Sequence, residues 1–253
     1  MFTKAIARTP CKNLVNGLTN ANLGIPDYSL ALKQHKKYIE ALKQCGLGVT
    51  VLEPDENYPD STFVEDTALL TPYCAVITNP GAFSRNGERT EMSQIVKNFY
   101  SKIESIEAPG TLEAGDVMMV GKHFYIGLSE RTNHTGADQL ITILSKFELT
   151  GSKISFVNLL HLKSGVSYLE NNNVLLTNSF INQPEFKKFN CVLVDDDESY
   201  AANSLWINEK VLVPNGFSKT KKKIEQLGYT VIEVEVSEFR KLDGGLSCLS
   251  LRF

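Results

Sequence analysis

The C-terminal end of the chain carries a cysteine in an unusual setting. Cys248 follows the pair Gly244 and Gly245 and is itself followed by only five residues. Glycine lets a backbone turn tightly and approach a ligand closely. A thiol is also the side chain that is most nucleophilic at neutral pH. Cys248 is therefore a candidate nucleophile, although a lone cysteine in a folded chain is more often buried and inert.

A nucleophile of this kind needs an acid–base partner and charges that hold a substrate. Asp66, Glu113 and His161 each lie in a polar segment beside an apolar stretch. Paired carboxylates suit a planar guanidinium cation, which they bind through charge-assisted hydrogen bonds. The thiolate of Cys248 could attack the guanidinium carbon while His161 protonates the departing amine and later activates water. Taken singly, these residues also have ordinary explanations as caps, turns or core residues.

The elements that would position these side chains repeat along the chain. Pairs of apolar strands joined by polar turns recur roughly every 40–50 residues. The expected pairs are 62–70 with 74–78, 113–120 with 123–126, 165–169 with 174–177, 204–207 with 210–213, and 246–253 with 3–8. Expected helices cover 30–42, 92–103, 140–147 and 219–227, and expected single strands cover 48–52, 154–157, 192–194 and 230–234. The pattern indicates repeated ββαβ units, either closed into a five-bladed α/β propeller or arranged as a generic α/β domain without symmetry.

Composition narrows the function classes. The chain has 253 residues, 42% of them apolar and 22% charged, which is typical of a globular protein. A net charge of -3 gives no general attraction to nucleic acid or to an acidic membrane surface. The five cysteines are widely spaced and form no CxxC motif, so neither a disulfide framework nor a zinc site is expected. We expect a single catalytic domain over 1–253 that is cytoplasmic and has no cofactor or resident metal, although a thiol and an imidazole could capture zinc as an inhibitor.

Several motifs together resemble one enzyme family. They are PDSTFVED at 59–66, LEAGD at 112–116, SERTN at 129–133, HLKSG at 161–165 and DGGLSC at 243–248. This set is similar to the dimethylarginine dimethylaminohydrolases, which belong to the guanidino-group-modifying enzymes together with arginine deiminase and the amidinotransferases. The resemblance covers nearly the whole chain, and the motifs occur in the family's order. It implies a pentein fold, a five-bladed pseudo-symmetric α/β propeller with the active site at its centre.

The resemblance also implies roles for individual residues. Cys248 would be the nucleophile, His161 the general acid and base, and Glu113 the residue that orients His161. The implied substrate-binding residues are Leu18, Asp60, Phe63, Glu65, Asp66, Arg85, Arg131, Leu242 and Asp243. Among these, Asp66 would bind the guanidinium, while Asp60 and the two arginines would hold the amino-acid end. The loop around Leu18 would close over the site.

The implied reaction converts Nω-methylated arginine and water into citrulline and methylamine or dimethylamine. An arginine deiminase acting on free arginine is the alternative within the enzymes, although such chains usually carry an additional helical insertion. A non-catalytic binding module on the same fold is the alternative outside them. The expected partner is therefore a small molecule, with no nucleic acid and no membrane, and the chain is expected to be a monomer or a homodimer.

Overall fold

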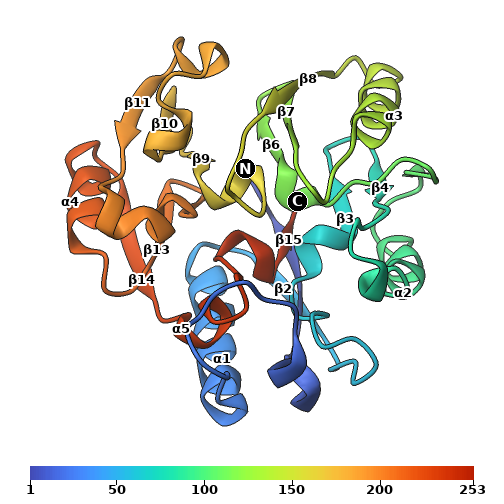
Figure 1. Cartoon of the computed structure of the whole chain (residues 1–253), viewed down its shortest axis with the longest axis horizontal. Coiled ribbons are helices and arrows are strands. Elements are labelled where there is room, and N and C mark those ends of the chain that lie inside the picture. Colours follow the sequence, from blue (N-terminus) through green and yellow to red (C-terminus); the bar gives the residue numbers. More distant parts are fainter. The chain divides into compact units, whose positions relative to one another are not determined.

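The computed structural model describes every residue of the chain, 1–253. Its strands form five separate three-stranded sheets (Figure 1). In each sheet the central strand pairs antiparallel with one neighbour and parallel with the other. This is the predicted ββαβ repeat, except that the connection between β10 (Asn173–Leu176) and β11 (Asn190–Leu193) contains only the 3-10 turns Asn178–Phe180 and Pro184–Phe186. None of the helices combines the length and the apolar character needed to cross a membrane.

Contacts between residues divide the chain into two compact units. The first unit comprises Met1–Val64 and Gly165–Phe253, and the second comprises Glu65–Ser164. The expectation of one catalytic domain over 1–253 stays a prediction.

The first unit contains three of the sheets. Their strands are β15 (Leu251–Arg252), β1 (Lys4–Arg8) and β2 (Gly48–Leu52); β9 (Val166–Tyr168), β10 (Asn173–Leu176) and β11 (Asn190–Leu193); β12 (Leu205–Ile207), β13 (Lys210–Pro214) and β14 (Thr230–Val234). Its helices are α1 (Tyr28–Gln44), α4 (Ser218–Gln226) and α5 (Ser237–Arg240). Helix α1 contacts β2, β14 and α5, and it buries Tyr38 and Leu42 in the apolar core of this unit.

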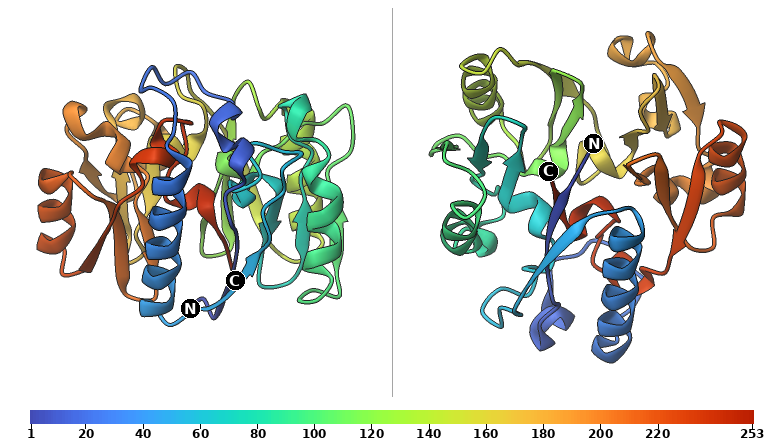
Figure 2. Two further views of the ribbon diagram at one scale, coloured as in Figure 1. Left: turned by 90° about the horizontal axis from the view of Figure 1, so that it is seen from below. Right: turned by 180° about the vertical axis from the view of Figure 1, so that it is seen from behind.

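The two ends of the chain lie side by side in the first unit (Figure 2). Strands β1 and β15 pair antiparallel, with Ala5 opposite Arg252 and Ile6 opposite Leu251. The backbone N–H groups of Thr3 and Lys4 both donate to the Phe253 carbonyl, at 2.9 and 2.8 Å. The predicted pairing of the C-terminal segment with residues 3–8 is confirmed, and it removes an exposed strand edge.

The second unit contains the other two sheets. Their strands are β3 (Ala68–Leu70), β4 (Ala75–Ile77) and β5 (Ile103–Ser105); β6 (Val117–Val120), β7 (His123–Leu128) and β8 (Thr150–Ser155). Its helices are α2 (Glu88–Val96) and α3 (His134–Ser145). Helix α3 begins where the Asn133 side chain accepts a hydrogen bond from the Gly136 N–H at 2.8 Å. It packs Leu140 and Leu144 against Phe124 of β7 in a fully buried core.

Short 3-10 helices precede the first strand of each repeat, and they correct three predicted strands. The segments 62–70, 113–120 and 246–253 were expected to begin as strands, but each begins with a turn or a 3-10 helix and forms a strand only near its end. The five 3-10 helices are η2 (Val64–Thr67), η4 (Ala114–Asp116), η5 (Leu162–Ser164), η8 (Asp196–Ala202) and η9 (Ser247–Leu249). Asp, Ser and Gly in these segments favour turns over strands, because their side chains compete for backbone hydrogen bonds or are absent.

Most expected helices are present, with one clear error. Helix α2 ends at Val96, and the segment that was expected to continue it to 103 instead ends in strand β5. Asn98, Tyr100 and Ser101 are weak helix formers and explain this early end. Helix α4 is confirmed, and Gly228 after it adopts a φ of 90° and donates its N–H to the Glu225 carbonyl, as expected of a glycine that ends a helix.

Candidate active site

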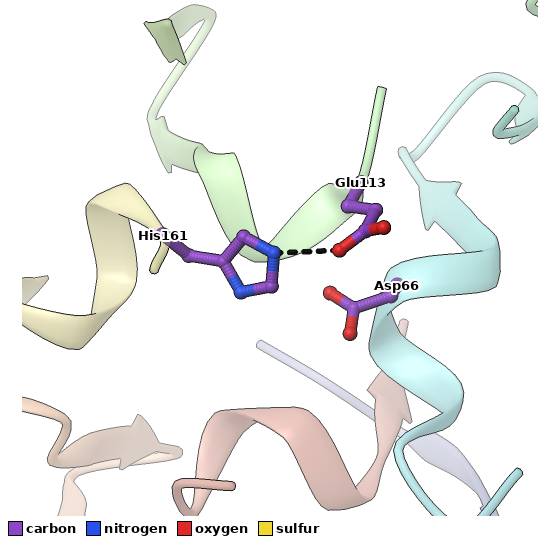
Figure 3. Close-up of side chains that lie close together, drawn as sticks. All are labelled: Asp66, Glu113 and His161. Atoms are coloured by element: carbon purple, nitrogen blue, oxygen red, sulfur yellow. Dashed lines mark hydrogen bonds and ion pairs between the residues drawn. The ribbon is translucent and has the colours of Figure 1, made fainter. Parts of the chain in front are cut away.

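Three buried polar side chains of the second unit lie close together (Figure 3). Asp66 lies in η2, Glu113 immediately precedes η4, and His161 immediately precedes η5. They are exposed by only 3%, 1% and 5%, and their oxygen and nitrogen ligand atoms all lie within 4.8 Å of one another. The convergence of these three residues, inferred from their order in the repeat, is therefore present. Two carboxylates and an imidazole at this spacing could hold a cation, either a guanidinium or a metal ion.

Glu113 and His161 form a buried ion pair. The Nε2 atom of His161 lies 2.7 Å from the Oε2 atom of Glu113. Burial alone would lower the pKa of His161, but the charges of Asp66, Asp116 and Glu113 outweigh burial and raise it to about 9. Burial conversely favours the neutral form of Glu113, but the hydrogen bond and charge of His161 lower the pKa of that carboxyl to about 2. The imidazole therefore carries a proton that it can give to a leaving group.

Asp66 is held in place by two protein donors. Its Oδ2 atom accepts from Nη1 of Arg85 at 2.6 Å, and its Oδ1 atom accepts from the Gly115 N–H at 3.1 Å. Arg85 is itself fixed by Glu88, whose two oxygens accept from Nε and Nη2, both at 2.9 Å. Glu88 was not identified from the sequence. The predicted contact of Arg85 with a substrate carboxylate stays a prediction, and in this structure its buried guanidinium binds these two protein carboxylates.

Two further side chains of the second unit were predicted to bind substrate. Arg131 places Nη1 3.6 Å from Oε1 of Glu113, and its side chain is 21% exposed. Glu65 is buried and forms an ion pair of 2.6 Å with Lys163. Lys163 lies in η5, two residues after His161, and was not assigned a role from the sequence. Arg131 therefore combines a contact to Glu113 with partial access to solvent, and its role in substrate binding stays a prediction.

Cys248 lies in the first unit, within the 3-10 helix η9. It is partly exposed, and its Sγ atom accepts a hydrogen bond from the Gly245 N–H at 3.3 Å. Neither glycine before it leaves room for a side chain. A Cβ atom on Gly244 would collide with the ring of Phe63, and one on Gly245 would lie 2.5 Å from the Asn203 side chain. The expected close approach of the glycines is therefore present, but it is made to protein side chains of the same unit.

The other predicted residues of the first unit cluster around the loop at Leu18. The Leu18 N–H donates to Oδ1 of Asp60 at 3.0 Å, and the Asn20 N–H donates to Oδ2 of Asp243 at 2.7 Å. Asp243 adopts a φ of 58°, which turns the chain between the buried Leu242 and the glycine pair. Carboxylates from two distant segments thus hold the loop that was expected to close over the site.

Phe63 packs inside the first unit. Its ring meets that of Phe239 edge to face at a centroid distance of 6.3 Å, and only 4% of the residue is exposed. The predicted role of Phe63 in substrate binding stays a prediction, as do the binding roles of Leu18, Asp60, Leu242 and Asp243.

Comparison with known proteins places these residues in a family. A family model described as N,N dimethylarginine dimethylhydrolase, eukaryotic, matches residues 26–181. The N(G),N(G)-dimethylarginine dimethylaminohydrolase of Pseudomonas aeruginosa is 56% identical over 254 residues, with 100% of both chains covered. The chain belongs to the dimethylarginine dimethylaminohydrolase family. The resemblance of its motifs to that family is therefore confirmed.

Solved structures of dimethylarginine dimethylaminohydrolases share the fold. The enzyme of Pseudomonas aeruginosa, in a cysteine-to-serine variant complexed with citrulline, matches with a TM-score of 0.99 at 55% identity over 100% of both chains. A histidine-to-glycine variant in an adduct with S-methyl-L-thiocitrulline also matches with a TM-score of 0.99 at 55% identity over 100% of both chains. The expected fold class, the five-fold pseudo-symmetric α/β propeller of the penteins, is confirmed.

Proposed function

We propose that this chain hydrolyses Nω-methylated arginine to citrulline and methylamine or dimethylamine. The observation that carries the proposal is the buried cluster in which two carboxylates, Asp66 and Glu113, flank the cationic imidazole of His161. The relative that is 56% identical along the whole chain bears the name of this activity, and a variant of it was crystallised with citrulline. Both the chemistry of the site and the family therefore favour a guanidinium substrate.

The carboxylates bind and orient the guanidinium. Asp66 is buried and pinned by Arg85 and Gly115, so it can meet the substrate without first reorganising. The N–H groups of a guanidinium lie in one plane and form paired hydrogen bonds with such carboxylates. Free guanidinium is a poor electrophile because its charge is delocalised, so fixed placement has to supply much of the rate. Placement of this kind is worth roughly 7–11 kcal/mol of the barrier.

The thiolate of Cys248 then attacks the central guanidinium carbon. A carbon–sulfur bond forms, and the bond from that carbon to the methylated nitrogen breaks as His161 gives its proton to the leaving amine. His161 next removes a proton from water, which attacks the thiouronium carbon, releases Cys248 and leaves citrulline. Glu113 stabilises the protonated imidazole through the 2.7 Å hydrogen bond.

The amino-acid end of the substrate sets the remaining assignments. Arg131 is suited to the α-carboxylate, because its side chain is 21% exposed and already lies beside Glu113. Asp60 is a buried carboxylate that accepts from the N–H of Leu18, and it is suited to the α-ammonium group. Closure of the Leu18 loop would exclude water during the attack. The proposed set of substrate-binding residues also includes Arg85, Glu65, Phe63, Leu242 and Asp243.

The setting of the enzyme is part of the proposal. All five cysteines are free thiols, which supports a reduced, cytoplasmic location. We also propose that the protein is a monomer or a homodimer and that it acts on a small molecule without a cofactor.

The test is citrulline formation from arginine, monomethylarginine and asymmetric dimethylarginine by the purified chain. We expect citrulline and a methylated amine from the methylated forms, and no citrulline after Cys248→Ser. Cys191→Ser is the matched control, because Cys191 is also partly exposed but lies on β11. Citrulline from arginine alone would assign the chain to the deiminases, and no citrulline from any of the three would favour a binding module.

A further inference from the structure

Asp116 is a buried carboxylate to which the proposed reaction gives no task. It is 0% exposed and is the last residue of η4, the turn that begins immediately after Glu113. A buried carboxylate is costly unless donors satisfy it. Such donors reach Asp116 from two other loops of the second unit.

One of these donors belongs to the residue that follows His161. The Leu162 N–H donates to Oδ1 of Asp116 at 2.8 Å. This bond fixes the backbone at the point from which the imidazole of His161 extends. Asp116 therefore bridges the segment that carries the general acid and the segment that carries Glu113.

The other oxygen of Asp116 is connected to the backbone of Glu113 through a second set of hydrogen bonds. Oδ2 accepts from Oγ of Ser129 at 2.6 Å, and this hydroxyl accepts from the N–H groups of Arg131 and Thr132 at 3.0 and 3.2 Å. The Thr132 hydroxyl in turn accepts from the Glu113 N–H at 3.2 Å. Asp116 is thus the hub of a network that ties together the loops carrying Glu113, Arg131 and His161.

The packing around the hub leaves little freedom. Gly127 on β7 faces it, and a Cβ atom there would lie 3.0 Å from Oδ1 of Asp116 and 2.8 Å from the Cβ atom of Leu162. The carboxylate and the backbone it holds are therefore confined by a neighbouring strand as well as by hydrogen bonds.

We infer that Asp116 is a positioning residue for the general acid His161. The inference rests on the proposed function. Asp116 acts through the Leu162 N–H to keep the imidazole 2.7 Å from Glu113, in the place from which it can protonate the leaving amine. A displacement of about 1 Å in such a group can lower a rate by about 10²-fold.

The experiment compares two leaving groups in the first turnover. Dimethylamine leaves asymmetric dimethylarginine only when it is protonated, whereas the thiol of S-methyl-L-thiocitrulline needs little help from an acid. A histidine-to-glycine variant of a related enzyme forms an adduct with S-methyl-L-thiocitrulline. Loss of acid positioning should therefore slow amine release far more than methanethiol release, whereas simple loss of folded protein would slow both equally.

For Asp116→Asn we expect amine release to fall by about 10²-fold, with a much smaller fall in methanethiol release. Ser129→Ala should show a weaker effect of the same kind, because it removes one of the two donors described above. Asp138→Asn is the matched control, because Asp138 is 60% exposed and pairs with Lys153 on the surface. Citrulline binding measured by calorimetry gives the number of intact sites, to which both rates are normalised.

Equal slowing of both leaving groups, or no slowing of either, would overturn the inference. If Asp116→Asn does not fold, as judged by its thermal unfolding, the ratio of the two rates in Ser129→Ala decides in the same way. Wild-type protein that forms citrulline from neither compound would overturn the proposed function itself. If the wild type is active on both compounds, the proposed function stands, and the variants test only the role of Asp116.

Discussion

The Nε2 atom of His161 lies 2.7 Å from the Oε2 atom of Glu113, and both side chains are almost completely buried. The other oxygen of Glu113 accepts from the Ala82 N–H at 3.2 Å and lies 3.6 Å from Nη1 of Arg131. One carboxylate thus holds the imidazole of His161 with one oxygen and lies beside Arg131 with the other. Replacement of Glu113 should therefore disturb the positions of both His161 and Arg131.

The pH dependence of the first turnover should follow the protonation of His161. Its pKa is raised from 6.5 to about 9, so the acid remains protonated above neutral pH and is lost as the pH rises through about 9. Glu113→Gln removes one of the charges that raise this pKa, so the decline should move to lower pH. We also expect amine release to slow by about 10²-fold or more. Rapid-quench profiles from pH 6 to 10 measure both effects, and an unshifted profile in Glu113→Gln would contradict the assigned pair.

Gly115→Ala should abolish activity. A Cβ atom at this position would lie 2.6 Å from Nδ1 of His161 and 2.8 Å from Oδ1 of Asp66, so one of the two must move. Crowding of this kind typically costs about 1–3 kcal/mol of stability in addition to the catalytic loss. Gly48→Ala is the control, because its Cβ atom would meet only the Thr3 carbonyl at 3.7 Å. Steady-state rates and urea unfolding report both effects, and an active Gly115→Ala would show that the cluster is less confined than described.

Glu88→Gln should destabilise the second unit and weaken substrate binding. It breaks a buried pair with Arg85, in which both side chains are 5% exposed, and it leaves the guanidinium that holds Asp66 without one of its charged partners. Removing one member of a buried pair costs about 3–5 kcal/mol. Glu107→Gln tests the same chemistry at the surface, because Glu107 is 70% exposed in its pair with Arg89, and it should cost less than about 1 kcal/mol. Urea unfolding and KM measure the difference, and equal effects of the two variants would refute the positioning of Asp66 by this pair.

His35 should make the protein sensitive to acid. Burial lowers its pKa from 6.5 to about 4, and its Nε2 atom has no hydrogen-bond partner. The unfolded chain therefore binds a proton more readily, so the stability contributed by neutral His35 is complete above pH 6.5 and is lost as the pH falls towards 4. The loss should be on the order of 3 kcal/mol. His35→Leu should flatten this part of the curve of unfolding free energy against pH, whereas the exposed His134→Leu should not, and identical curves for the two variants would rule out this origin.

Local sequence patterns were sufficient for the repeat and for the convergence of Asp66, Glu113 and His161. The polar turns between apolar segments mark the hairpins because turn chemistry acts over a few residues. The Gly244–Gly245 pair before Cys248 marks a crowded backbone, and the structure places Phe63 and Asn203 against those two glycines. The pairing of the chain ends was also predictable, since a closed ring of strand units needs a partner for its first strand.

Tertiary contacts decide the features that the sequence did not reveal. Asp116 and Leu162 are 46 residues apart, and nothing in the segment around Asp116 distinguishes a hub from a turn residue. Glu88 lies at the start of α2, where an acidic residue is expected in any case for its interaction with the helix dipole. Its pairing with Arg85 depends on the turn Phe83–Arg85 before α2, which brings the two side chains together. The same reason explains the missed strand β5, whose three residues gain their strand geometry by pairing with β4.

Trapping the covalent intermediate on Cys248 is the most direct test of the whole account. Protein quenched in acid during turnover of asymmetric dimethylarginine, then digested and analysed by mass spectrometry, should carry the thiouronium adduct on the peptide that contains Cys248. The adduct should be absent from Cys248→Ser. It should accumulate when hydrolysis of the thiouronium intermediate is slowed. Citrulline formation that continues in Cys248→Ser, with no adduct on the wild-type peptide at any quench time, would contradict the account.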